Sequence, residues 1–225
     1  MSVKTEVLDI AAKQLQDATN TTWIAATLLS YYNLALLEIC NLKPEAYPVT
    51  KTITLVAGAS QSLDDDAIEL LDVVCNMGTG GSTPGKNIRM LAKEAVDLLL
   101  PDWQTYPAGT VILFVMIDSR NPKYYYTIPP VPTSNPKPRI KLIQAEMPDP
   151  VTDSAEDIAL DSSYTPACID YIIYRALAES TTIPGAMQKA GLFLSKFMQD
   201  LGIKTAIEKT VERKEKGEPD AAPAA

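Results

Sequence analysis

Histidine does not occur in this chain of 225 residues, and cysteine occurs only three times. The lack of histidine excludes Ser-His-Asp and Cys-His nucleophile activation, imidazole acid–base catalysis and the commonest zinc ligand. A hydrolase built on this sequence would have to use carboxylates, lysines or a carboxylate-bound magnesium ion. Cys40, Cys75 and Cys168 are widely separated and lie among apolar neighbours. This placement predicts buried, reduced thiols rather than a metal or redox site.

Long apolar runs are also lacking. The longest are residues 111–117 and the interrupted run 23–40, both shorter than the roughly 18–20 apolar residues that span a bilayer. The acidic, amphipathic start has neither the basic segment, the apolar centre nor the cleavage site of a secretory signal. We therefore expect a soluble protein with no membrane contact, which stays in the cytoplasm of the cell that makes it.

Positive charge is in deficit, because the formal net charge is -8. A general nucleic-acid binder normally carries a basic face that neutralises phosphates, so this class is disfavoured. An acidic protein can still surround DNA without gripping it, since repulsion screened within about 8–10 Å keeps a duplex mobile. The 46% hydrophobic content is sufficient for at least one substantial core.

Helical periodicity is present at both ends of the chain. It predicts helices over residues 4–17, from Thr21 or Thr22 to Leu42, over 164–179 and over 184–201. Pro44 should end the second, and Gly202 should cap the last. Beyond Ile203 the sequence becomes charged and then rich in proline and alanine, which predicts a flexible tail.

The middle of the chain alternates with the period of β-strands. Strands are expected at 48–58, 67–77, 111–117, 123–128 and 139–148, with 60–66 as a turn and 118–122 as a hairpin loop. A short helix is the alternative for 67–77. The proline-rich stretch 129–138 should be extended or turning. One further helix is expected from Lys86 to Pro101, with Ile88, Leu91, Ala92, Ala95, Leu98 and Leu99 on its apolar side.

These elements predict an α+β fold, mainly a helical bundle with a β-rich hairpin insertion and a flexible C-terminal tail. The expected divisions are N-terminal bundle helices at 1–48, a strand pair and Gly-rich loop at 49–85, a bundle helix at 86–103, a β-rich extension at 104–150, C-terminal bundle helices at 151–203 and the tail at 204–225.

Residues 80–87, GGSTPGKN, match seven of the eight positions of a phosphate-binding loop. Asn87 stands where that motif needs a hydroxyl for magnesium, and Pro84 removes one amide from the loop. The apolar run that ends at Asp118 leads into a hairpin rather than a crossover helix, and the sequence has too few β–α alternations for a nucleotide-binding sheet. A flexible loop is the favoured interpretation, and a nucleotide hydrolase that uses Lys86 and Asp118 stays a distant alternative.

Two further clusters contain side chains that could bind a ligand or a partner. Asp64, Asp65 and Asp66 could bind a hard cation, but they lack calcium-loop spacing, so a solvated turn is preferred. The run 124–126 consists of tyrosines, whose alternate rings point to opposite faces of a strand. At least one ring should lie in the core, and an exposed ring could belong to an interface.

Several segments, in order along residues 20–202, resemble the head-to-tail adaptor (connector) proteins of short-tailed bacteriophages. They are WIAATLLSYYNLALLEI, ITLVAGASQSLDDDAIELLDVVCNMG, LLLPDW, DSRNPKYYYTIPPVP, ACIDYIIYRALAES and AGLFLSKFMQDLG. Matches to the turn patterns of that family fall at Gly58, Gln61, Leu63, Pro122, Tyr126, Pro129 and Pro130.

The resemblance implies a structural virion protein and not an enzyme, with no catalytic, cofactor-binding or metal residues. Such adaptors form a ring, usually of twelve copies, between the portal and the next tail component (a nozzle or tube). Double-stranded DNA passes through the ring without specific binding. The resemblance places the chain in the virion neck after synthesis in the bacterial cytoplasm, and makes Lys204–Ala225 a candidate portal-docking arm. Another tail-completion or tail-tube protein is the alternative.

Overall fold

The structure is a computed structural model that describes residues 2–181 and 183–202 in full and residues 203–215 by their backbone. The chain divides into two compact units, one formed by residues 1–43 with 148–225 and the other by residues 44–147. The first unit is helical and the second is built on β-sheets, which confirms the α+β class.

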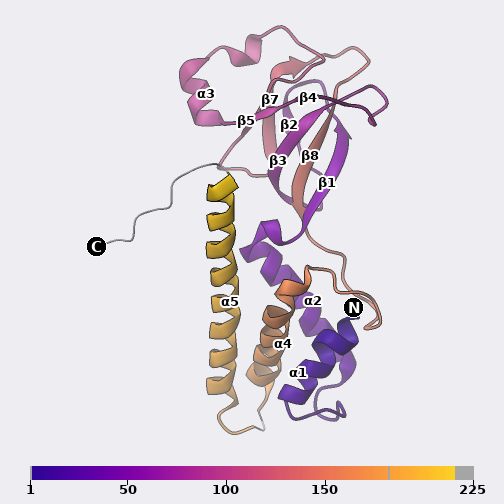
Figure 1. Cartoon of the computed structure of the whole chain (residues 1–225), viewed down its shortest axis with the longest axis vertical. Coiled ribbons are helices and arrows are strands. Elements are labelled where there is room, and N and C mark those ends of the chain that lie inside the picture. Colours follow the sequence, from indigo (N-terminus) through magenta and orange to yellow (C-terminus); the bar gives the residue numbers. More distant parts are fainter. Residues whose placement is uncertain (1, 182, 216–225) are drawn as a thin grey trace, which may run out of the picture. The chain divides into compact units, whose positions relative to one another are not determined.

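The helical unit is organised around one central helix. Its elements are a π-helical turn η1 (Lys4–Leu8), α1 (Asp9–Gln14), α2 (Ala25–Leu42), a short η4 (Ser162–Tyr164), α4 (Thr165–Glu179) and α5 (Ala186–Glu215). Helix α4 packs against both α5 and α2 and buries residues on nearly every turn. In Figure 1, α4 lies between α5 and α2 over the lower part of this unit.

The entry to α2 differs from the prediction, since the helix begins at Ala25 and not at Thr21 or Thr22. The carboxylate of Asp17 accepts hydrogen bonds from the backbone N–H groups of Thr21, Thr22 and Trp23, each at 2.8 Å. These bonds hold residues 21–23 in a turn. The end of α2 at Leu42, just before Pro44, agrees with the prediction.

The last helix also differs from the prediction. Gly202 does not cap α5, which continues to Glu215, so the expectation of a flexible tail is wrong for residues 204–215. The segment 204–215 contains alanine, glutamate, lysine and arginine, which are good helix formers and allow a helix that has begun in a packed segment to continue. Residues 216–225 of the expected tail lie outside the described residues.

The β unit contains two four-stranded sheets within the described part of the chain, in the orders β1-β8-β3-β4 and β2-β7-β6-β5. The strands are β1 (Pro48–Thr54), β2 (Gly58–Ser62), β3 (Ala67–Met77), β4 (Pro84–Asn87), β5 (Arg89–Ala92), β6 (Phe114–Ile117), β7 (Tyr124–Val131) and β8 (Arg139–Glu146). A short η2 (Pro44–Ala46) precedes them, and α3 (Lys93–Leu99) with η3 (Trp103–Thr105) joins β5 to β6. All pairs are antiparallel except β5 with β6.

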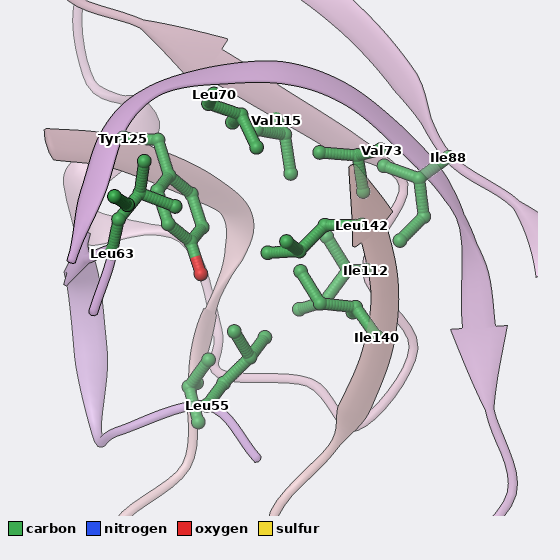
Figure 2. Packing of buried hydrophobic residues seen from close by; sticks show 12 residues of the cluster. Leu55, Leu63, Leu70, Val73, Ile88, Ile112, Val115, Tyr125, Ile140 and Leu142 are labelled. Carbon is green, nitrogen blue, oxygen red and sulfur yellow. The ribbon is translucent and has the colours of Figure 1, made fainter. Parts of the chain in front are cut away.

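The core of the β unit consists of residues from both sheets. It contains Leu55, Leu63, Ala67, Leu70, Val73, Ile88, Ile112, Val115, Tyr125, Val131, Ile140 and Leu142. Figure 2 shows their side chains converging, with the Tyr125 ring among leucines and isoleucines. Burial of this apolar surface provides most of the free energy that holds the sheets together.

Two predictions within the β unit are wrong. Residues 60–62, which were expected in a turn, belong to strand β2, and residues 86–92, which were expected to begin a helix, belong to strands β4 and β5 on either side of Ile88. The backbone N–H groups of Ile88 and Arg89 donate to the carbonyls of Val74 and Leu113 in neighbouring extended segments. Because these partners satisfy the backbone of 86–92, the helical spacing of its apolar residues does not produce a helix.

The helix that does form, α3, is short and lies within the β unit, where residues 86–103 belong by their contacts. Its Leu98 and Leu99 were expected to face a core but are 83% and 75% exposed. Other local predictions agree with the structure. Tyr125 is fully buried while Tyr124 is exposed, and the three cysteines are free and buried.

Candidate functional site and assembly surfaces

The stretch that resembles a phosphate-binding loop closes a β-hairpin. The Gly78 N–H donates to the Thr83 carbonyl at 2.8 Å, and the Gly81 N–H donates to the Gly78 carbonyl at 2.7 Å. Lys86 lies in strand β4, which pairs with β3, and the next helix begins only at Lys93. A phosphate cradle needs free amides at the start of a helix. Residues 80–87 therefore lack the geometry of that site.

Asp118, the second residue of the nucleotide hypothesis, caps its own turn. Its Oδ1 accepts a hydrogen bond from the Arg120 N–H at 3.0 Å. The run before it was expected to enter only a hairpin, but β6 also pairs in parallel with β5, and α3 lies in the crossover. Lys86 comes before this β5–α3–β6 unit and belongs to the other sheet. In a phosphate-binding site the lysine lies in the loop between the first strand and the helix of the βαβ unit. Lys86 lies before the first strand of this unit, so Lys86 and Asp118 do not form such a site.

The acidic triplet at 64–66 contributes to a surface ion-pair network. Lys51 Nζ lies 2.9 Å from Asp64 Oδ2 and 2.5 Å from Glu146 Oε1, and so links β1, β8 and the turn before β3. Hydrogen bonding to Glu146 and Asp64 raises the pKa of Lys51, and the same ammonium lowers the pKa of Asp64. Asp65 and Asp66 accept hydrogen bonds through their backbone carbonyls, from Lys123 Nζ and the Met147 N–H. All three aspartates therefore make contacts that stabilise the local structure of the β unit.

Gln61, one of the residues that match the turn pattern of the adaptor family, closes the turn between β1 and β2. Its buried side chain accepts a hydrogen bond from the Val56 N–H at 2.8 Å and donates to the carbonyls of Val56 and Gly58. Gly58 has φ +101°, a conformation that glycine adopts without strain. Leu63, two residues on, is buried in the core. These three residues shape one turn. The sequence showed only that they match the turn pattern of the family, and the structure shows the contact that each one makes.

Asn76 links strand β3 to β4 and to the segment that precedes β6, and this role was not predicted from the sequence. Its Nδ2 donates to the Ile112 carbonyl at 2.7 Å and to the Lys86 carbonyl at 3.0 Å, while its Oδ1 accepts from the Ile112 N–H at 2.8 Å. The side chain is buried, so these bonds satisfy backbone groups that water does not reach. A polar residue in the apolar half of strand 67–77 was the available signal.

Helix α3 is fixed to its sheet by an aromatic contact. Trp103 is buried with its ring 5.5 Å from that of Tyr126 in an edge-to-face arrangement, and its Nε1 donates to Asp97 Oδ1 at 2.8 Å. Asp97 also pairs with Lys93, whose ammonium lies over the Tyr126 ring. This arrangement leaves the opposite side of α3 to solvent.

That opposite side forms the most exposed apolar surface of the β unit. It includes Leu98 and Leu99, with Leu100 half as exposed. Strand β5, the start of α3 and the end of β6 surround a cavity of about 370 Å³. It is lined by Met90, Leu91, Ala92, Glu94, Ile117 and Ser119. Exposed apolar surface of this kind is typical of contacts with other proteins. The signal in the sequence was the run of three leucines, which cannot all face one side of a helix.

A family model for SU10 adaptor proteins matches residues 3–218, almost the whole chain. The chain belongs to this family. As an SU10 adaptor protein it is a bacteriophage head-to-tail adaptor, as the ordered segments of the sequence indicated. No curated protein matches the chain. Among the helices of this SU10 adaptor protein that the structure describes, none is long and apolar enough to cross a membrane.

Proposed function

We propose that the chain is a structural component of the virion neck, where copies form a ring between the portal and the tail. The observation that carries this proposal is the family match over residues 3–218. Twelve copies are the expected number, and the ring provides a channel for double-stranded DNA and a platform for the next tail component. The net charge of -8 supports this role, because an acidic wall lets DNA slide without binding it.

The site geometry supports an assembly role rather than a catalytic one. The polar side chains that could suggest chemistry, namely Asp64, Asp118, Gln61 and Asn76, are engaged in turns, ion pairs and backbone contacts. The side chains that have no partner in the fold are apolar instead, as at the exposed Leu98 and Leu99. Such surfaces gain free energy when another protein covers them.

Cryo-electron microscopy of virions, or of the chain mixed with its portal protein, tests the proposal. We expect a closed ring directly beneath the portal, with density for every copy. The proposal fails if the chain is missing from particles or occurs only outside the neck. A tail-completion or tail-tube protein is the second possibility within the structural class, and the same images distinguish it, because such a protein contacts the tail and leaves the portal untouched.

The C-terminal segment is proposed as the arm that attaches to the portal. Its first part continues α5 to Glu215, so the arm is helical there rather than flexible throughout. Deletion of residues 204–225 should leave both units folded and weaken binding to the portal, measured by co-sedimentation. Deletion of 216–225 alone is the matched control that separates the helical part from the end of the chain. Unchanged binding after the longer deletion would show that the segment is dispensable.

A further inference from the structure

Two faces of the helical unit are uncharged and uncovered. Helix α2 contains one charged residue, Glu38, in its 18 residues. Its outward face is formed by Thr27, Ser30, Leu34, Leu37 and Asn41, spaced at three and four residues, and we call it the α2 face. Leu34 and Leu37 are 38% and 42% exposed. A surface helix normally carries charged residues on its solvent side, and charge is depleted where interfaces form.

The second face lies on α5. This helix buries Ala186, Ala190, Phe197 and Leu201. Beside that buried row runs another, formed by Met187, Gly191, Leu194, Met198 and Gly202, which we call the α5 face. Met187 and Met198 are 71% and 50% exposed, and this face also has no charged residue. Helix α5 thus has one apolar row that its own chain covers and one that it leaves open.

The two glycines of the α5 face are not required by close packing against the residues that the structure describes. A Cβ atom added at Gly191 or Gly202 would meet nothing within 4 Å. A glycine in a helix interior lowers the stability of the helix relative to alanine. At a contact between two helices, small residues let the other helix approach closely, so the large Leu34 and Leu37 of the α2 face complement the open positions of the α5 face.

The faces match in extent but cannot meet within one chain. At a rise of about 1.5 Å per residue, the α2 face is about 21 Å long and the α5 face about 22 Å. Helix α4 packs against both helices, whereas α2 and α5 share no comparable contact in the described part of the chain. In Figure 1 both helices run towards the same end of the helical unit, with α2 inclined to α5. Copies related by rotation about an axis along α5 therefore bring the two faces together with both helices running towards the same end.

We infer that the α5 face of one copy packs against the α2 face of the next copy, as the lateral contact of the ring. The occupant of each face is thus a second copy of this chain. The inference rests on the proposed function, since a contact between two different faces propagates from copy to copy and closes into a ring when the rotation permits. In parallel register Leu37 lies opposite Met198, because each is about two thirds of the way along its face.

Disulfide cross-linking in assembled particles tests the contact. Cys40, Cys75 and Cys168 are buried, so they leave introduced cysteines as the exposed thiols. A chain with both Leu37→Cys and Met198→Cys should give, after oxidation, a ladder of oligomers on a non-reducing gel. Either substitution alone should give monomer, because the contact joins unlike faces. The matched control is Leu37→Cys with Lys189→Cys, whose second position is exposed on the other flank of α5 and should give no ladder.

The outcomes separate this inference from the proposed function. If particles contain the chain at the neck but give no ladder, the proposed contact is wrong and the proposed ring is unaffected. Dimers from a single substitution show a contact between like faces and also overturn it. A chain that is missing from particles overturns the proposed function first. As a second measurement, Gly191→Phe should leave the monomer folded, because the position is open, and should reduce incorporation into particles at least tenfold, whereas Lys189→Phe should not.

Discussion

The hydroxyl of Tyr125 is the feature from which stability can be predicted most directly. The residue is 0% exposed, and among the described residues its oxygen has no hydrogen-bond partner. Figure 2 shows the oxygen directed into the apolar cluster. Burial, with a smaller effect from the Asp64 charge, raises the pKa of Tyr125 well above its usual value. We therefore expect that Tyr125→Phe, which removes only this oxygen, stabilises the β unit.

The magnitude follows from the cost of burying a hydroxyl without a partner. Protein mutational data place that cost at about 1–3 kcal/mol. Removing the oxygen also leaves a small void, which takes back part of the gain. We expect a net increase of about 1–2 kcal/mol in the free energy of unfolding. For a chain of this length, this raises the midpoint of thermal unfolding by about 2–8 °C.

The two tryptophans allow the assay to report on each unit separately. Trp103 lies in the β unit beside Tyr126, and Trp23 lies in the helical unit. In a Trp23→Phe background, urea unfolding followed by fluorescence reports the β unit through Trp103. The midpoint should shift to higher urea with an unchanged slope, because the surface exposed on unfolding stays the same.

The matched control is Tyr31→Phe in the helical unit. The Tyr31 hydroxyl donates to Glu179 Oε2 at 2.6 Å, so its removal should lower the free energy of unfolding by about 1 kcal/mol. The same chemical change should thus have opposite signs at the two positions. If Tyr125→Phe lowers stability as Tyr31→Phe does, the buried hydroxyl has a partner and the reasoning is refuted.

Three further predictions concern residues that fix local structure. Hydrogen bonds from Trp23 and from Thr21 lower the pKa of Asp17 to about 2, below its usual 3.8. The resulting stabilisation of the helical unit is present above about pH 4 and declines as the pH falls towards 2. In acid titration followed by circular dichroism, Asp17→Asn should remove this dependence, and an unchanged profile would contradict the assignment. Asn76→Ala leaves backbone groups of Ile112 and Lys86 without partners and should cost about 2–3 kcal/mol in urea unfolding; a loss below 0.5 kcal/mol, roughly the scatter of surface substitutions, would show that these bonds are replaced. Gly109→Ala should cost about 1–3 kcal/mol, because its Cβ would lie 2.6 Å from Pro129 Cγ, whereas Gly191→Ala, with open space, should stabilise by up to about 1 kcal/mol; equal effects would argue against the close contact.

Sequence patterns were sufficient where local propensity and tertiary contacts favour the same structure. Helix α2 has a broad apolar face and ends before Pro44, and α4 follows the same pattern. Strands β1 and β8 alternate with period two and pair with each other in the sheet. The ordered segments also indicated the adaptor family. In these cases the periodicity of apolar residues reflects which side of the element is buried, so it can be read without the fold.

Periodicity misled where distant partners decide the backbone. Residues 86–92 have helical spacing, yet they pair with β3 and β6, strands that lie before and after them in the chain. The near-complete phosphate motif at 80–87 became a hairpin turn and strand β4 for the same reason, since the Gly81 amide donates within the turn and Lys86 lies in the strand. Residues 204–215 show the reverse case, in which good helix formers extend a helix that tertiary packing had already started.

The sequence by itself determined the composition of the molecule: an acidic, histidine-free chain with helical ends, a β-rich middle and the ordered segments of a phage adaptor. Only the tertiary structure decided which apolar residues remain uncovered. Leu98 and Leu99, the two leucines of the α2 face and the two methionines of the α5 face are of residue types that also occur in the buried cores. Whether such a residue is buried depends on which other element packs against it, and that is a property of contacts between residues far apart in the chain.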